Sequence, residues 1–260
     1  MLGRPSVAWF RDRAEVAGTR RINMELSSIK ALTFDVFGTV VDWRTSVARD
    51  ARKILGAKGH DLDWNDFALR WRSLYQPAMG EVRSGHVDWR KLDDLHEMNL
   101  EHILADLNIH DLKDSEVEHL NQAWHRLDPW PDSVEGLTRL KSRYIVATLS
   151  NGNVSLLVNM AKRGGIPWDV VLSAEIAGYY KPDPEAYLKS AEILDLRPEQ
   201  CLMVAAHNAD LVSAATCGFH TAFVARLHEY GPGQTTDLQP EHAFDFVARD
   251  LVDLAEQLGT

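Results

Sequence analysis

The sequence predicts an α/β fold, a doubly wound parallel sheet that carries an inserted helical cap domain. The first observation is that short runs of apolar and β-branched residues alternate with helical patterns over the second half of the 260 residues. Such alternation is typical of parallel strands joined by crossover helices. The second observation is a long segment after the first run, in which apolar residues recur every three or four positions. This spacing predicts helices throughout that segment.

Five runs are expected to form buried strands, because each is short, apolar and bounded by turn signals. They are "IKALTFD" (29–35), "YIVATLS" (144–150), "WDVVLSA" (168–174), "CLMVAAH" (201–207) and "HTAFVAR" (220–226). Helical patterns separate the later runs, and Gly218 is expected to end one of these helices. The carboxyl ends of the strands would share one edge of the sheet, where ligands bind in such folds.

The strands and the helical segment predict the domain boundaries. We expect residues 29–45 and 129–260 to form the α/β core, and residues 46–128 to form the helical cap. The motif "DPWPDS" closes the cap, since proline stops a helix. Residues 1–28 lack the continuous apolar run of a signal peptide, so we expect a poorly ordered N-terminal extension.

The composition argues against several classes of partner and location. A formal net charge of −10 argues against binding to nucleic acid or to an anionic membrane, since either would favour a basic face. No apolar run approaches the ~20 residues of a membrane-spanning helix. The two cysteines, Cys201 and Cys217, suggest reduced thiols and a cytoplasmic location rather than a disulfide framework.

Polar side chains follow several of the expected strands. Each alone is weak evidence, because a Ser-Asn pair after a strand is more often a turn, and a single lysine is usually solvated. Together they predict a binding or catalytic site at the carboxyl edge of the sheet. The residues are Asp35, Thr39, Ser150, Asn151, Lys181, His207, Asn208 and Asp210.

Four motifs, in order along the chain, resemble the haloacid dehalogenase superfamily, and specifically its L-2-haloacid dehalogenase branch. They are "FDVFGTVVD", "LSNGN", "YYKPDPEAY" and "VAAHNAD". The resemblance covers the chain from Ile29 to the C-terminus, the cap included. It implies a hydrolase that acts on carbon–halide bonds, with a small-molecule 2-haloacid as its substrate and no cofactor.

The resemblance also indicates which chemistry the first motif performs. Phosphatases of the superfamily carry a second aspartate two residues after the nucleophile, as general acid, and a magnesium ligand in the fourth motif. This chain has Phe37 and Ala206 at those positions. The family therefore implies a metal-independent reaction, in which Asp35 displaces the halide to form an aspartyl ester. Water then hydrolyses the ester to a 2-hydroxy acid.

Further roles are carried over from the family position by position. Lys181 is expected to keep Asp35 ionised and to aid hydrolysis, and Asp210 to hold Lys181 or orient the water. Arg72 would meet the departing halide or the carboxylate, whereas its neighbour Arg70 is expected to be solvated. The other expected contacts with the nucleophile, substrate or halide are Phe37, Thr39, Ser150, Asn151, Tyr187 and Asn208.

His207 is a departure from the family pattern. The best-known members carry asparagine there, and serine where this chain has Ala205. An imidazole could hydrogen-bond the hydrolytic water, or His207 could cap the next helix. The sequence leaves both roles open.

Other functions remain open at this stage. Asp35 could open a strained ring beside a carboxylate, as in the related azetidine-carboxylate hydrolases. A magnesium-dependent phosphatase is disfavoured by Phe37 and Ala206, and a non-catalytic binding protein would not require Asp35, Lys181 and Asp210. Members of the family are commonly homodimers, so a homodimer is expected here.

Overall fold

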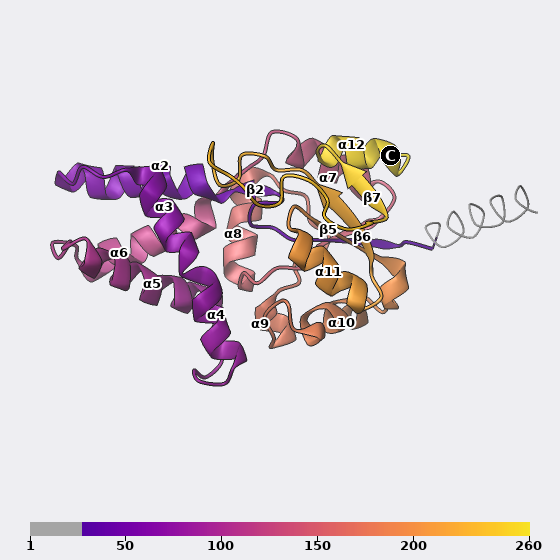
Figure 1. Ribbon diagram of the computed structural model, residues 1–260, viewed down its shortest axis with the longest axis horizontal. Helices are drawn as coiled ribbons and strands as arrows, with labels where there is room; N and C mark the ends of the chain where they lie inside the picture. The colour runs from indigo at the N-terminus through magenta and orange to yellow at the C-terminus, as the bar shows by residue number, and fades with distance from the viewer. Residues whose placement is uncertain (1–27) are drawn as a thin grey trace, which may run out of the picture.

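A five-stranded parallel sheet forms the centre of the protein, as the computed structural model shows for residues 28–260 (Figure 1). The order β4-β1-β5-β6-β7 places β1 between β4 and β5, so Ala31 pairs with both Ile145 and Cys201. The predicted α/β fold is confirmed, and the predicted extension lies outside the described residues except for Ser28. The strands are β1 (Ala31–Phe34), β4 (Ile145–Thr148), β5 (Cys201–Ala205), β6 (His220–Val224) and β7 (Phe246–Ala248).

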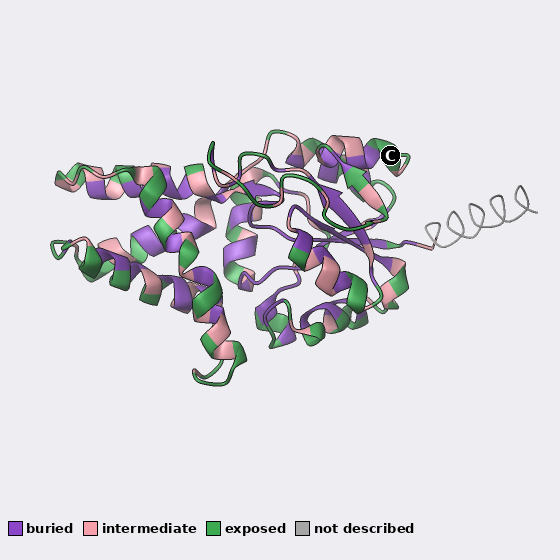
Figure 2. Ribbon diagram, in the orientation of Figure 1, coloured by how far each residue is buried: buried purple, intermediate pink, exposed green. Residues whose placement is uncertain are grey.

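Both faces of the sheet are covered, which explains why every residue of β1 and β5 is buried. Leu32 and Val204 pack into one cluster with the helices on their side, while Met203 packs into the other. Figure 2 shows the buried residues in the sheet and on the inner sides of the helices. The flanking helices are α7 (Ser133–Lys141), α8 (Val154–Gly164) and α12 (Leu251–Gln257) on the first side, and α10 (Pro184–Ile193) and α11 (Asn208–Thr216) on the second.

One predicted strand is wrong. Residues 168–174 run beside β4 but make only isolated bridges, through Val170 and Ser173. Backbone hydrogen bonds such as that from the N–H of Asp169 to the carbonyl of Val146, at 2.8 Å, form only part of a ladder. Side chains supply others, since the Thr148 hydroxyl donates to the Leu172 carbonyl at 2.6 Å and accepts from its N–H at 2.8 Å. The Asp169 carboxylate likewise accepts the N–H of Val146 at 3.0 Å.

The sequence analysis missed β7, which pairs with β6 at the edge of the sheet. It has three residues, and Val247 at its centre is 48% exposed. A strand this short offers too few positions for an alternating pattern to be recognised.

Five helices follow β1 and lie to one side of the sheet, on the left in Figure 1. β2 (Val41–Asp42) pairs antiparallel with β3 (Asp128–Pro129), so the chain leaves and rejoins the sheet region at one place. The predicted boundaries of core and cap stay predictions. The helices are α2 (Trp43–Leu55), α3 (Trp64–Ser73), α4 (Tyr75–Arg83), α5 (Leu92–Asp106) and α6 (Asp114–Asn121), and a 3₁₀ turn spans Gln122–Arg126.

The helical pattern over residues 64–85 is divided at Leu74, which ends α3 and precedes α4. Pro77 lies in the first turn of α4 and has no N–H to donate to the carbonyl of Ser73. This division places Arg72 in the last turn of one helix and Tyr75 at the start of the next.

Within residues 28–260, no helix combines the length and the apolar character needed to cross a membrane.

Candidate active site

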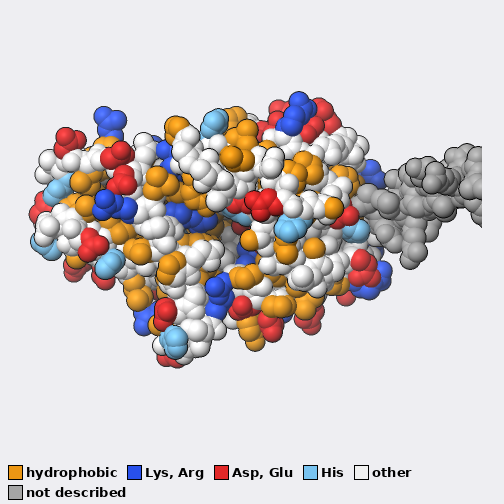
Figure 3. Space-filling view, in the orientation of Figure 1, with side chains coloured by type: hydrophobic (Ala, Val, Ile, Leu, Met, Phe, Trp, Pro, Cys, Tyr) orange, Lys and Arg blue, Asp and Glu red, His pale blue; other side chains and the backbone are white. Residues whose placement is uncertain are grey.

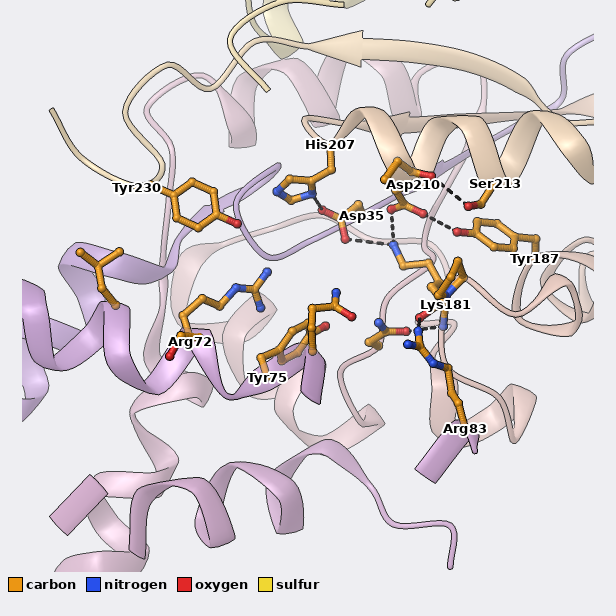
Figure 4. Close-up of a pocket in the computed structure, with 16 residues that line it drawn as sticks. Asp35, Arg72, Tyr75, Arg83, Lys181, Tyr187, His207, Asp210, Ser213 and Tyr230 are labelled. Atoms are coloured by element: carbon orange, nitrogen blue, oxygen red, sulfur yellow. Dashed lines mark hydrogen bonds and ion pairs between the residues drawn. The ribbon is translucent and has the colours of Figure 1, made fainter. Parts of the chain in front are cut away.

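A cavity of about 700 Å³ lies where the helices of residues 43–126 face the carboxyl edge of the sheet. The loops after β1, β4 and β5 each contribute to it, as the parallel topology predicts. Figure 3 shows the surface hollowed between the two regions, with Lys or Arg atoms in the hollow. Figure 4 shows the lining residues, which include Asp35, Arg72, Tyr75, Asn151, Lys181, Tyr187, His207, Asp210 and Tyr230.

Asp35 is buried directly after β1, and each of its oxygens has partners. The Thr39 hydroxyl donates to Oδ2 at 2.7 Å, and Lys181 Nζ donates to Oδ1 at 3.0 Å. His207 Nδ1 lies 3.2 Å from Oδ2. Burial alone would raise the pKa of Asp35, but the charges and hydrogen bonds of Lys181 and His207 hold it well below its usual value. Asp35 is therefore an ionised carboxylate in an enclosed site.

Lys181 lies between two carboxylates. Its Nζ is 2.5 Å from Asp210 Oδ2, and the Tyr187 hydroxyl donates to Asp210 Oδ1 at 2.6 Å. Burial would lower the pKa of Lys181, but Asp210 and Asp35 outweigh it and raise the pKa. Lys181 stays charged, and both oxygens of Asp210 are occupied.

His207 lies at the N-cap position of α11, but its side chain makes no capping hydrogen bond. It contacts Asp35 with one nitrogen, and its Nε2 lies 2.9 Å from Oε2 of Glu229. Burial would lower the pKa of His207, whereas Glu229 and Asp35 outweigh it and hold the pKa well above its ordinary value. His207 is thus an imidazolium between two carboxylates, which the capping interpretation did not foresee.

Glu229 is a residue of the site that the sequence analysis missed. It lies in an irregular loop after β6 and is 1% exposed. The glycine at position 38 was the available signal in the sequence, because a residue without a side chain permits another group to approach closely. Gly38 has a φ of +87°, and the Glu229 carboxylate approaches it. A Cβ at Gly38 would lie 2.1 Å from Glu229 Oε1. The glycine of "FDVFGTVVD" therefore leaves the space that the carboxylate of Glu229 occupies, although the two residues lie far apart in the sequence.

Arg72 enters the cavity from α3, while Arg70 lies on the surface and pairs with Asp66 at 2.6 Å. The Arg72 guanidinium carbon lies 4.0 Å from the centre of the Tyr75 ring and 5.4 Å from that of Trp43. Its Nη1 is buried and has no hydrogen-bond partner among the residues that the structure describes. A cation with an unused donor in an aromatic surround can bind an anion. Tyr75 was not predicted.

Of the remaining predicted residues, some line the cavity and others lie behind its wall. Asn151 lines it, but its Oδ1 accepts the N–H of Lys181 at 2.7 Å. The Ser150 hydroxyl accepts the N–H of Gly152 at 3.2 Å, as in a turn. Phe37 is buried and packs edge-on against Trp124.

Asn208 does not line the cavity, and its predicted contact with substrate has no support in the geometry. Its Nδ2 donates to Asp237 at 2.9 Å and to the carbonyl of Gln239 at 3.1 Å. Its Oδ1 accepts the N–H of Glu241 at 2.8 Å. The side chain is fully used in holding the loop that follows β6.

Comparisons with known proteins give a consistent result. Residues 29–218 match the model of the haloacid dehalogenase-like hydrolases. The chain is 31% identical to (S)-2-haloacid dehalogenase 4A of Burkholderia cepacia, over 77% of this chain and 85% of that protein.

Two solved structures extend the comparison. A defluorinating L-2-haloacid dehalogenase is 46% identical, with a TM-score of 0.88 and coverage of 89% of this chain and 96% of that chain. Another L-2-haloacid dehalogenase is 43% identical, with a TM-score of 0.86 and coverage of 88% and 98%.

The packing around Arg72 predicts a pH-dependent stability. His96 is buried, stacks on Trp124 at 4.3 Å between ring centres, and its ring nitrogens have no partners among residues 28–260. Burial lowers the pKa of His96 to about 3 in the folded protein. Between pH 6.5 and pH 3, His96 is therefore protonated in the unfolded chain and neutral in the folded chain. Folding stability should therefore fall as the pH drops from 6.5 towards 3.

A His96→Phe variant tests this effect, because phenylalanine keeps the ring and cannot titrate. From pH 7.5 to pH 5 the wild type should lose about 2 kcal/mol of unfolding free energy more than the variant does. Urea unfolding of both proteins at the two pH values measures the difference. Parallel pH profiles would contradict the assignment to His96.

Proposed function

The chain belongs to the haloacid dehalogenase-like hydrolases, and from this premise we propose that it hydrolyses short 2-haloalkanoic acids to 2-hydroxy acids. The observation that carries the proposal is the ionised Asp35 at the cavity, with Phe37 in place of the general acid that family phosphatases use. A halide leaves without needing a proton. A bare carboxylate nucleophile therefore suits this leaving group.

In the first step, an oxygen of Asp35 attacks the carbon that bears the halogen, with inversion, and the halide departs. Arg72 supports this step, since its unused Nη1 offers a buried donor to the departing anion. Phe37, Trp43 and Tyr75 surround the guanidinium and exclude water from it. The product is an ester between Asp35 and the substrate.

In the second step, water attacks the Asp35 carbonyl carbon and releases the 2-hydroxy acid. Lys181, held by Asp210, lies beside the oxygen that becomes negative in the tetrahedral intermediate. The Tyr187 hydroxyl fixes Asp210 from its other side. Lys181 and Asp210, which help to keep Asp35 ionised before the reaction, thus also assist the hydrolysis that regenerates the free Asp35 carboxylate.

The magnesium of the superfamily's phosphatases does not fit these residues. Ala206 replaces a carboxylate ligand, and its N–H donates to Thr39 at 2.9 Å. The oxygens of Asp35 already face the cations of Lys181 and His207. Residues 28–260 hold no group of three or more His, Cys, Asp or Glu side chains placed for a metal ion. We therefore propose a metal-independent reaction.

Ring opening beside a carboxylate is a second candidate, because it uses the same nucleophile and the same anion-binding groups. Halide release from chloro-, bromo- and fluoroacetate separates the two reactions. Fluoroacetate belongs in this panel because the solved relative at 46% identity is named as defluorinating. We further propose a cytoplasmic homodimer. Cys201 and Cys217 form no disulfide, which supports the location. Members of the family are commonly homodimers, which supports the assembly.

Replacing Asp35 by asparagine should abolish turnover, since a neutral amide is a poor nucleophile. In the wild type, a single turnover in H₂¹⁸O should place the label in the Asp35 side chain. Mass spectrometry of the peptide that contains Asp35 measures the label. Label found only in the product would show direct attack by water and would contradict the ester mechanism.

Dehalogenation should be unchanged by EDTA and should not rise with added Mg²⁺. The physical reason is that Ala206 removes a ligand and two cations flank Asp35. Halide release with and without EDTA measures this, with phosphate-ester hydrolysis as the parallel assay. Strong Mg²⁺-dependent phosphatase activity would overturn the dehalogenase proposal.

Arg72→Lys should lower kcat roughly 100-fold or more, because lysine lacks the planar fork of donors that meets the departing anion. Arg70→Lys is the matched control on the same helix, and its exposed pair with Asp66 should leave the rate unchanged. Steady-state halide release compares the two variants. A loss in the control alone would mean that the wrong arginine has been assigned.

A further inference from the structure

Glu229 is a buried carboxylate that the two steps described above do not use. Both of its oxygens have partners, because Trp43 Nε1 donates to Oε1 at 2.8 Å and His207 Nε2 lies 2.9 Å from Oε2. Burial would raise the pKa of Glu229, whereas the charge and hydrogen bond of His207 outweigh it and lower the pKa. An ionised group enclosed this far costs folding energy unless it is paired, and the pairing of Glu229 is with His207 and Trp43.

The loop that carries Glu229 is tied to the nucleophile's own loop. Arg226 donates to the carbonyl of Thr39 at 2.8 Å, and its two terminal nitrogens reach Asp132 at 2.7 and 2.8 Å. Gln234 closes the same loop by donating to the carbonyl of Arg226 at 3.0 Å. These contacts fix the distance from Glu229 to Asp35, with His207 between them.

His207 spans the two carboxylates with its two ring nitrogens, Nδ1 towards Asp35 and Nε2 towards Glu229 (Figure 4 shows the Asp35 side). A base whose far nitrogen is held by a carboxylate, and whose near nitrogen faces the reacting group, is the arrangement that activates nucleophiles in hydrolases. Here the near nitrogen lies beside the carboxyl group that water must attack.

We propose that His207 is the general base for hydrolysis of the Asp35 ester and that Glu229 is the positioning residue that holds it in the active tautomer. The inference rests on the proposed function, because it concerns the second step of that reaction. It also answers the question that the sequence left open about His207.

Formation of the ester changes His207 from an acid to a base. Before the reaction, Asp35 and Glu229 both favour the imidazolium. Alkylation removes the charge of Asp35, while the cations of Lys181 and Arg72 remain nearby, so the pKa of His207 falls. The Nδ1 proton then leaves through the cavity that His207 lines, and the Nε2 proton stays on the bond to Glu229.

The protons balance over the second step. Water forms a bond to the Asp35 carbonyl carbon as Nδ1 takes one of its protons. The tetrahedral intermediate breaks its bond to the substrate oxygen, which takes that proton from Nδ1 and leaves as the hydroxyl of the product. The water's second proton then passes from the Asp35 carboxyl to Nδ1, which restores the ion pair. One proton per turnover has been released, together with one halide.

The other titratable groups around the cavity are less suited to this task. Both oxygens of Asp210 are engaged by Lys181 and Tyr187, and Lys181 is itself charged. Burial raises the pKa of Tyr75 and of Tyr187, so neither hydroxyl is an anion at neutral pH. Among these groups, His207 is the one that esterification of Asp35 converts to a neutral form able to accept a proton, and its Nδ1 lies next to Asp35.

Glu229→Gln tests the proposal. The amide can still accept from Trp43, but its NH₂ would donate to His207 Nε2 and force the proton onto Nδ1, where the base is needed. Ester formation should continue and hydrolysis should slow roughly 100-fold or more. With chloroacetate, the variant should release one equivalent of chloride rapidly and then stall, and intact-protein mass spectrometry should show the acyl adduct.

Two measurements separate positioning from a structural role. ¹⁵N-histidine NMR should show His207 with both nitrogens protonated in the resting wild type and as the neutral Nδ1–H form in the variant. Asp245→Asn is the matched control, because it removes another carboxylate that contacts a histidine, His220, outside the cavity. It should change neither the burst nor the steady-state rate.

The outcomes are distinct. Normal turnover of Glu229→Gln without an adduct overturns the proposal, and so does equal slowing of both steps. If Glu229→Gln does not fold, His207→Gln is tested instead, because the glutamine side chain can form hydrogen bonds but cannot accept a proton as a base. Full turnover by that variant overturns the proposal. Failure of the proposed function itself is recognised separately, since the wild type would then release no halide or place no ¹⁸O label in Asp35.

Discussion

The buried negative charge of Asp35 is the constraint on which the rest of the site depends. A carboxylate in this position costs several kcal/mol unless cations and donors surround it. The protein meets the cost with a row of alternating charges, Glu229, His207, Asp35, Lys181 and Asp210. Each member is held by the next, so Asp35 stays ionised. The row draws on the segments after β1, β5 and β6, the start of α11 included, and on the irregular segment that carries Lys181.

This row explains what could be predicted from the sequence. Asp35 and Asp210 belong to motifs that follow β1 and β5, and Lys181 belongs to a motif that follows the segment beside β4. A parallel arrangement brings the ends of such segments together whatever the details of the loops. Glu229 belongs to no motif and lies in a loop without periodicity, so only the fold could show its contact with His207. Tyr75 was missed for a similar reason, because its position depends on the division of the helix at Leu74.

The errors in the secondary structure have local physical causes. Residues 168–174 carry the apolar pattern of a strand, but the side chains of Thr148 and Asp169 take some of the hydrogen bonds that a continuous ladder would use. No propensity argument includes such side-chain competition across two segments. Asn208, predicted to contact the substrate, has a side chain that holds the loop of Asp237 and Glu241. In both cases polar side chains satisfied backbone groups that the sequence pattern left unspecified.

The close approach of Gly38 to Glu229 has a consequence for how such a site could be transplanted. No side chain at position 38 is compatible with the carboxylate where it stands, so the two residues are contingent on each other. With Glu229 in this place, a side chain at position 38 would push its carboxylate away from His207. Grafting the histidine–glutamate pair onto another protein of this fold therefore requires glycine at the position of Gly38.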